Sequence, residues 1–64
     1  MLMRLMQKWV DANEVRVGDY VQGSDKVMRK VTRMYHGDVF VTIHMGEYEA
    51  LCSYNNCLFI EREI

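Results

Sequence analysis

One stretch near the N-terminus decides the predicted fold: Trp9-Val-Asp-Ala-Asn-Glu-Val-Arg-Val-Gly-Asp-Tyr-Val21. It contains the only tryptophan of the chain and a Gly-Asp pair between two apolar runs. Because large apolar side chains are mostly buried in small domains, we expect Trp9 and Val10 to enter the core. The stretch therefore predicts a corner of the fold, where the chain leaves one strand and begins another at Tyr20.

Two local signals shape this corner. Asp11 and Glu14 match a capping box, in which the first side chain accepts a hydrogen bond from an early backbone N–H and the second reaches back. Gly18 follows too closely for more than one helical turn, and Gly18-Asp19 predicts a tight turn because glycine tolerates a positive φ. We therefore expect one capped turn at residues 11–14 and a strand directly after Asp19.

Composition places the chain among small globular proteins. Its 64 residues are 50% hydrophobic, which argues against intrinsic disorder and suits a single domain over residues 1–64. The small core limits the free energy of unfolding to about 3–5 kcal/mol. The net charge of -1 argues against a protein whose main task is to clamp duplex phosphates.

The N-terminal segment has two interpretations. We favour a mobile tip at residues 1–7 that leads into a short strand at Lys8–Val10. Alternatively, the apolar residues from Leu2 to Trp9 lie at helical spacing and form one stripe. The chain has no apolar run long enough for a membrane span, and its start lacks a secretory cleavage site. The expected location is therefore cytoplasmic, with no membrane association.

The segment Lys26–Tyr35 is ambiguous between a helix and a strand. Its apolar residues have helical spacing, with Ser24 and Gly37 as candidate caps. Its β-branched residues, and the compact turn that follows, favour one strand of a hairpin. We favour a bent strand, in which a bulge explains the irregular apolar spacing.

The clearest strand is Val39–Met45, where successive side chains alternate in character. The residues expected to face the core are Val39, Val41, Ile43 and Met45. Those expected on the outer face are Phe40, Thr42 and His44. Two further strands are expected at Tyr48–Ser53 and Cys57–Ile60, separated by a short polar turn.

The pattern Ala12-x-Glu14-Val15-x-Val17-Gly18-Asp19-x-Val21 resembles the A-x-E-L-x-V-G-D-x-V segment of Hint domains, the hedgehog and intein group. It is also similar to a segment of small phage-encoded proteins with an SH3-like barrel. The resemblance implies an all-β chain that forms a small five-stranded SH3-like barrel with one short helical turn. It further implies a 3₁₀ turn near Tyr54 and an origin in a phage or prophage.

The Hint resemblance raises self-splicing, but the sequence lacks the residues that this chemistry needs. Hint domains begin with a nucleophilic Cys or Ser, whereas this chain begins with Met1. The sequence contains no Thr-x-x-His element, and Asn55 stands where a histidine precedes the Asn-Cys junction. So short a chain also has little room for a substrate pocket beside its core. We therefore predict that the protein is not an enzyme.

The cysteines and histidines do not predict a metal site. Cys52 and Cys57 have C-x4-C spacing, and zinc would need His36 and His44 as its two further ligands. Two free thiols are expected in a cytosolic protein, although the spacing also permits a bridge. We predict neither a metal nor another cofactor.

Basic and aromatic residues form the candidate working surface. Half of the basic residues lie between Lys26 and Arg33, and in a regular strand Arg29 and Arg33 would point the same way. The candidate partner-binding residues are Lys26, Arg29, Lys30, Arg33, Tyr35, Phe40, His44, Tyr48 and Tyr54.

Two functional hypotheses follow, beside the interpretation that these residues form only a solvated face. In the favoured one, the protein is a non-enzymatic binding module, a phage or prophage accessory protein that binds and inhibits a host or phage protein. In the alternative, the basic stripe Lys26–Arg33 binds nucleic acid, with aromatic rings stacking on bases. The expected oligomeric state is a monomer or a weak homodimer.

Overall fold

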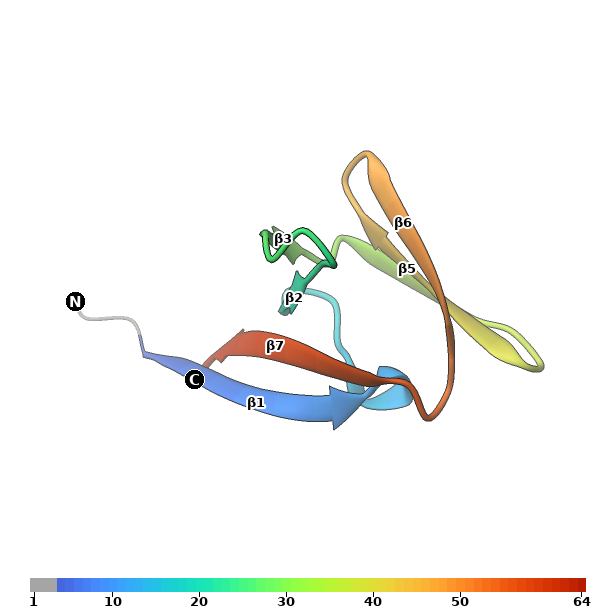
Figure 1. Cartoon of the computed structure of the whole chain (residues 1–64), viewed down its shortest axis with the longest axis horizontal. Coiled ribbons are helices and arrows are strands. Elements are labelled where there is room, and N and C mark those ends of the chain that lie inside the picture. Colours follow the sequence, from blue (N-terminus) through green and yellow to red (C-terminus); the bar gives the residue numbers. More distant parts are fainter. Residues whose placement is uncertain (1–3) are drawn as a thin grey trace.

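The computed structural model describes residues 4–64 and confirms the predicted all-β class. In these residues seven strands form two antiparallel sheets (Figure 1). Sheet A contains, in spatial order, β1 (Leu5–Asp11), β7 (Cys57–Glu63), β2 (Tyr20–Gln22) and β3 (Met28–Lys30). Sheet B contains β4 (Arg33–His36), β5 (Phe40–Met45) and β6 (Tyr48–Ser53). In the described residues the only helical element is η1 (Ala12–Glu14), and no helix there is long enough to cross a membrane.

The predicted five-stranded barrel is wrong. Within residues 4–64 no strand belongs to both sheets, and the two sheets do not close on each other. The segment Lys26–Tyr35, expected as one strand, is divided into β3 and β4. The strand expected at Lys8–Val10 is present and extends over Leu5–Asp11 as β1.

The chain passes from sheet A to sheet B at Val31 and Thr32. The Val31 amide donates to the carbonyl of Asp19, just before β2, at 2.7 Å. The Thr32 amide donates instead to the carbonyl of His44 in sheet B, at 2.8 Å. Val31 is fully buried and Met34 packs against the same core, so the alternation of side chains shifts by one residue between them. The segment is extended and the alternative helix does not form, but the single bent strand that we favoured is wrong, because β3 and β4 are separate strands in different sheets.

The position predicted for the tryptophan is wrong. Neighbouring residues of a strand face opposite sides, and Val10 is the one that is buried. Trp9 therefore faces outward, is 65% exposed, and packs against Phe59 of β7 with ring centroids 5.3 Å apart. Residues 5–7 of the expected mobile tip belong to β1, and residues 1–3 lie outside the described residues.

The turn expected at residues 11–14 is present, but its predicted cap is wrong. η1 is a 3₁₀ turn, and the Asp11 side chain makes no capping hydrogen bond. The Ala12 and Asn13 amides donate instead to the carbonyls of Asn56, at 2.8 Å, and Tyr54, at 3.3 Å. The turn between β6 and β7 thus satisfies the backbone donors that a capping side chain would otherwise satisfy.

The second half of the chain departs from the prediction in three places. Val39 lies in the turn before β5 and is exposed, whereas Val41 and Ile43 are buried as expected. The segment around Tyr54 is a single hydrogen-bonded turn and not a 3₁₀ turn. β7 continues three residues beyond the expected end because it lies between β1 and β2 and pairs with both.

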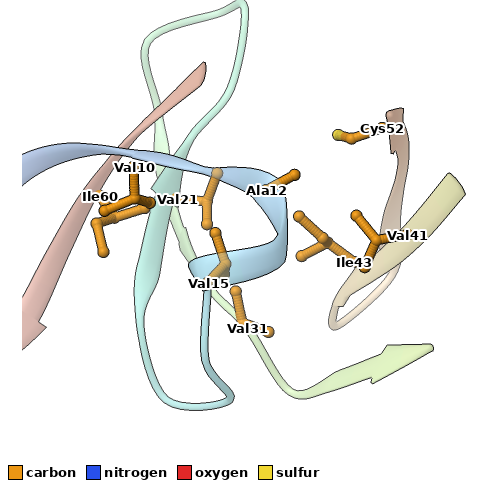
Figure 2. Close-up of a cluster of buried hydrophobic side chains, with 9 residues drawn as sticks. All are labelled: Val10, Ala12, Val15, Val21, Val31, Val41, Ile43, Cys52 and Ile60. Atoms are coloured by element: carbon orange, nitrogen blue, oxygen red, sulfur yellow. The ribbon is translucent and has the colours of Figure 1, made fainter. Parts of the chain in front are cut away.

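The core lies between the two sheets (Figure 2). Val10, Val21 and Ile60 of sheet A lie on one side, and Val41, Ile43 and Cys52 of sheet B on the other. Ala12 and Val15, from η1 and the residue that follows it, lie between these groups. Ala12 and Val15 of the corner quoted first therefore pack between the two sheets, although its tryptophan is outside the core.

One buried ion pair fixes the end of this corner. Gly18 has the expected positive φ of 99°, and the tight turn places Asp19 where it is only 3% exposed. Arg62 of β7 binds this carboxylate through two hydrogen bonds, Nε–Oδ1 at 2.9 Å and Nη2–Oδ2 at 2.8 Å. A third bond comes from the Arg16 amide at 2.9 Å. The ion pair thus ties the chain before β2 to the C-terminal strand.

Candidate functional site

The structure separates the candidate binding residues instead of placing them on one surface. Arg29 lies opposite the buried Val21 in the β2–β3 pair and so belongs to the inner side of sheet A. Arg33 lies opposite His44 on sheet B. The expectation that Arg29 and Arg33 point the same way is therefore wrong, because the break at residues 31–32 shifts the alternation.

Four of the predicted residues do share one surface, the outer face of sheet B. Residues directly opposite each other in paired strands lie on the same face. Arg33 pairs with His44, and Tyr35 pairs with Thr42, which pairs in turn with Leu51. The outer face of sheet B consists of Arg33, Tyr35, Phe40, Thr42, His44, Glu49, Leu51 and Ser53.

The apolar members of this face are exposed to solvent. Tyr35 and Leu51 are each 66% exposed, and Phe40 is 47% exposed. The opposite side of the same sheet holds the buried Val41 and Ile43, so sheet A covers one side of sheet B only. Three large apolar side chains thus lie uncovered on one face of a three-stranded sheet, around Thr42.

Polar side chains flank this apolar group at the end of β5. Arg33, His44 and Glu49 occupy adjacent positions across the three strands. The His44 Nδ1 atom lies 3.5 Å from the Glu49 carboxylate. The face therefore offers both signs of charge beside its aromatic residues.

Leu51 is the apolar member of this face that the sequence did not identify. A leucine between an alanine and a cysteine is typical of a core position, and nothing in the strand pattern marks it as exposed. Its exposure follows from the register, which pairs it with Thr42 and places Cys52 inward. Glu49, opposite His44, was missed for the same reason.

Arg29 and Tyr48 form a second arrangement, at the edge of the sheets. The Arg29 guanidinium lies over the Tyr48 ring, with its central carbon 3.9 Å from the ring centroid. It also binds Asp25 through two hydrogen bonds, at 3.1 and 2.7 Å. These residues, with Gly23, Met45 and Ala50, line a hollow of about 330 Å³, which we call the edge hollow.

The remaining candidates lie elsewhere. Lys26 is exposed in the β2–β3 turn, and Lys30 lines a separate hollow of about 310 Å³ together with Arg16 and Arg62. The Tyr54 hydroxyl donates to the Gly37 carbonyl, and its ring stacks on His36 with ring centroids 6.2 Å apart. Tyr54 therefore has a structural partner, and the two lysines do not join the outer face of sheet B.

The thiols occupy different environments. Cys52 and Cys57 are both free; Cys52 is buried, and burial raises the pKa of its thiol. Cys52 faces the core while His44 lies on the opposite side of sheet B, so the sheet separates them. Among residues 4–64, no three His, Cys, Asp or Glu side chains are grouped closely enough to hold a metal ion.

The fold and the site define a class of small all-β protein: two open sheets around one core, with an exposed aromatic face on the smaller sheet. Comparisons with known protein families, curated proteins and solved structures found no match for this chain.

Proposed function

We propose that the protein is a non-enzymatic module that binds another protein through the outer face of sheet B. The observation that supports this most is the exposure of Tyr35, Phe40 and Leu51 on that one face, around Thr42. Small monomeric proteins rarely leave large apolar side chains grouped in water unless a partner covers them. Tyr and Arg residues are also the commonest anchors of protein interfaces.

The charges beside this group favour a protein partner over a nucleic acid. Arg33 and His44 share their row with the carboxylate of Glu49, which would repel a phosphate backbone. The alternative hypothesis needs the stripe Lys26–Arg33 on one surface. Arg29 is instead bound by Asp25, and Lys30 and Arg33 belong to different sheets.

A narrower role comes only from the resemblance of residues 12–21. On that ground we propose a phage or prophage accessory protein that acts in the host cytoplasm and inhibits the protein it binds. The outer face of sheet B supplies a surface for such binding, and the choice of target is left to experiment.

A pull-down from a bacterial lysate with matched variants tests the surface. Tyr35→Ser with Leu51→Ser removes two exposed side chains of the outer face of sheet B. Val17→Ser with Val27→Ser removes two exposed apolar side chains from loops outside it. We expect the first variant to recover about tenfold less of a bound protein, because substitution of a hot-spot residue has an effect of this size. The control should recover as much as the unmodified chain. Equal recovery by both variants would reject this surface.

Retention on a single-stranded oligonucleotide tests the alternative. We expect weak retention that is unchanged in a Lys30→Glu, Arg33→Glu variant. Strong, salt-sensitive retention that this variant loses would favour nucleic-acid binding instead.

A further inference from the structure

A second exposed surface lies on the outer side of β1 and β7, which run side by side at one edge of sheet A (Figure 1). Val10 and Ile60 mark the inner side of these strands, because both are buried. Side chains alternate along a strand, so the residues next to Val10 and Ile60 face away from the core. We call this surface the tryptophan face. Its residues with aromatic or polar side chains include Gln7, Trp9, Asp11, Phe59, Glu61 and Glu63.

Two aromatic rings lie at the centre of the tryptophan face. Trp9 is 65% exposed, although tryptophan is among the residues with the highest average burial. Phe59, its cross-strand partner, is partly buried, and the two ring centroids are 5.3 Å apart with the ring planes at 58°. Most of the indole therefore contacts solvent. Because tryptophan is enriched among the residues that dominate binding energy, Trp9 has the character of an interface anchor.

Carboxylates flank these rings. Asp11 follows Trp9 on the same side of β1, and Glu61 lies opposite Gln7 and diagonal to Trp9. Diagonal neighbours in a sheet lie within reach of aromatic and long side chains. The Gln7 Nε2 atom donates to Glu61 Oε2 at 3.1 Å, which holds the carboxylate toward β1 without neutralising its charge. Glu63 adds a third carboxylate on the same side of β7.

In the described residues no cation balances these charges. None of the three carboxylates forms an ion pair within residues 4–64. Lys8 and Arg62 belong to the inner side of sheet A, and Arg62 has its own carboxylate partner. Lys30 is the only base on the outer side of sheet A in that range, and Tyr20 of β2 lies between it and Glu61. At about 5 Å per strand, the backbones of these two residues are about 10 Å apart.

An aromatic surface beside unpaired carboxylates matches a basic side chain. The face of an aromatic ring attracts a cation, tryptophan most strongly, and a neighbouring carboxylate accepts hydrogen bonds from the same head group. The aliphatic stem of a lysine or arginine packs on the rings at the same time. The carboxylates would repel a nucleic acid or an anionic membrane. Two copies of the tryptophan face would also repel each other, which argues against a symmetric dimer through it.

We propose that the tryptophan face binds a basic segment of a partner protein, with an arginine or lysine side chain over Trp9 and its head group beside Glu61 and Asp11. This surface is separate from the outer face of sheet B, because the core lies between the two sheets. The tryptophan face is thus a second binding surface, and each surface can be tested while the other is intact.

The single tryptophan reports on this surface directly. Caesium and iodide ions both quench exposed indoles by collision, and they carry opposite charges. Because the carboxylates attract cations and repel anions, we expect the ratio of caesium to iodide quenching to exceed that of N-acetyltryptophanamide about twofold, at a constant ionic strength of about 0.1 M. Equal or stronger relative quenching by iodide would mean that the surroundings of Trp9 are not acidic, and would overturn the proposal.

Matched charge variants assign this effect to the tryptophan face. Glu61→Gln with Glu63→Gln should remove most of the difference between caesium and iodide. Asp38→Asn with Glu47→Gln changes the net charge equally at two exposed turn residues outside the face, and should retain the difference. Equal behaviour of the two variants would show that the total charge of the protein, and not this surface, attracts the cation.

A short peptide supplies the basic side chain. The probe is acetyl-Gly-Arg-Gly-Arg-Gly-amide, and its control carries citrulline, which keeps the size and planar end of arginine but has no charge. NMR of the isotope-labelled chain follows the backbone amides and the indole N–H. We expect the arginine peptide to shift the signals of Trp9, Phe59 and Glu61 and to bind about fivefold more tightly than the citrulline peptide. Equal binding of both peptides, or no shift at about 5 mM peptide, would overturn the proposal.

Two substitutions distinguish the contribution of the ring from that of the charge. Trp9→Leu keeps an apolar side chain but has no aromatic face, so it should weaken binding of the arginine peptide about fivefold, and Trp9→Phe should restore part of the loss. Glu61→Gln should weaken binding about threefold and make it less sensitive to NaCl. Thermal midpoints check that each variant is folded, and Glu61→Gln tests the charge with the ring in place.

The position of the shifts distinguishes this surface from the outer face of sheet B. Shifts confined to His44 and Glu49 would place the cation on that other face and overturn the proposal. Self-association of the protein alone through the tryptophan face, or tight binding of a single-stranded oligonucleotide there, would overturn it as well. Tyr35→Ser with Leu51→Ser should leave peptide binding unchanged, even where the same variant loses its partner in the pull-down.

Discussion

Two arginine–aspartate pairs in this protein have nearly the same geometry and very different surroundings. Arg62 binds Asp19 through two hydrogen bonds of 2.9 and 2.8 Å, and Arg29 binds Asp25 through two of 3.1 and 2.7 Å. Each carboxylate also accepts one backbone amide, from Arg16 or Val27 respectively. The contacts alone do not distinguish the two pairs.

Burial and chain separation distinguish them. The Asp19 side chain is 4% exposed and its partner is 43 residues away, whereas the Asp25 side chain is 51% exposed and its partner is four residues away. Exposed pairs contribute little to stability because water and salt screen them. A buried pair that loses one partner leaves a charge without compensation. We therefore expect the Asp19 pair to hold the fold and the Asp25 pair to shape only a local turn.

The largest expected effect comes from breaking the buried pair. Asp19→Ala removes the carboxylate that accepts from the Arg62 guanidinium and the Arg16 amide, and Arg62 keeps only the Glu14 carbonyl, at 3.1 Å. We expect a loss of about 2–3 kcal/mol in the free energy of unfolding, measured by urea denaturation. Because the free energy of unfolding of the whole chain is only about 3–5 kcal/mol, about 0–3 kcal/mol should remain, and the urea midpoint should fall sharply.

A double variant distinguishes the cost of an unpaired charge from the cost of lost side-chain volume. Asp19→Ala with Arg62→Met removes both charges, and we expect it to regain part of the lost stability. If Asp19→Ala unfolds at the same urea concentration as Asp25→Ala, the distinction between the two pairs is wrong.

Both pairs should lose their contribution to stability at low pH, and salt should affect the two losses differently. Burial raises the pKa of the Asp19 carboxyl, but hydrogen bonds from Arg62 and the Arg16 amide lower it more, so it lies below its usual value. The hydrogen bond from Arg29 lowers the pKa of Asp25 to about 2. Both groups have lower pKa values when folded, so each stabilises above about pH 4 and loses this contribution as pH falls through its folded pKa.

We expect urea midpoints to fall between about pH 4 and pH 2, and less so in Asp19→Asn or Asp25→Asn. About 0.5 M NaCl should reduce the share of this fall in midpoint that Asp25→Asn removes, because salt screens exposed charges. It should leave unchanged the share that Asp19→Asn removes. An equal effect of salt on both parts would contradict the difference in burial.

The smallest expected effect comes from breaking the exposed pair. Asp25→Ala leaves Arg29 stacked on Tyr48 and open to solvent. We expect the thermal midpoint, followed by circular dichroism, to change by less than about 3 °C. Asp38→Ala, at another exposed turn carboxylate, serves as the control for loss of charge. A much larger drop for Asp25→Ala would mean that the β2–β3 turn supports the core.

Patterns over a few residues predicted the structure correctly where side-chain alternation or backbone freedom determines it. The alternation in residues 39–45 identified Val41 and Ile43 as core residues, and Gly18 marked the tight turn through its tolerance of positive φ. The same approach failed at Trp9, because hydrophobicity argued for burial while the register with Val10 forced the ring outward. It failed at Asp11 because the cap comes from the distant Tyr54–Asn56 turn.

The candidate site was predicted in part for the same reason. Tyr35, Phe40 and His44 lie on one face because β4 and β5 are neighbours in the sequence and form a hairpin. Leu51 could not be assigned to that face without the register of β6, and Arg29 could not be separated from Arg33 without the break after Val31.

By itself the sequence determined the all-β class, most strand positions and the tight turn at Gly18, because these depend on side-chain alternation and backbone freedom over a few residues. Only the tertiary structure decided that two open sheets form in place of a barrel, that Arg62 neutralises Asp19, and that one apolar face remains uncovered. Those features depend on which distant segments meet and in what register, and a one-residue shift in register moves every side chain of a strand to the other face.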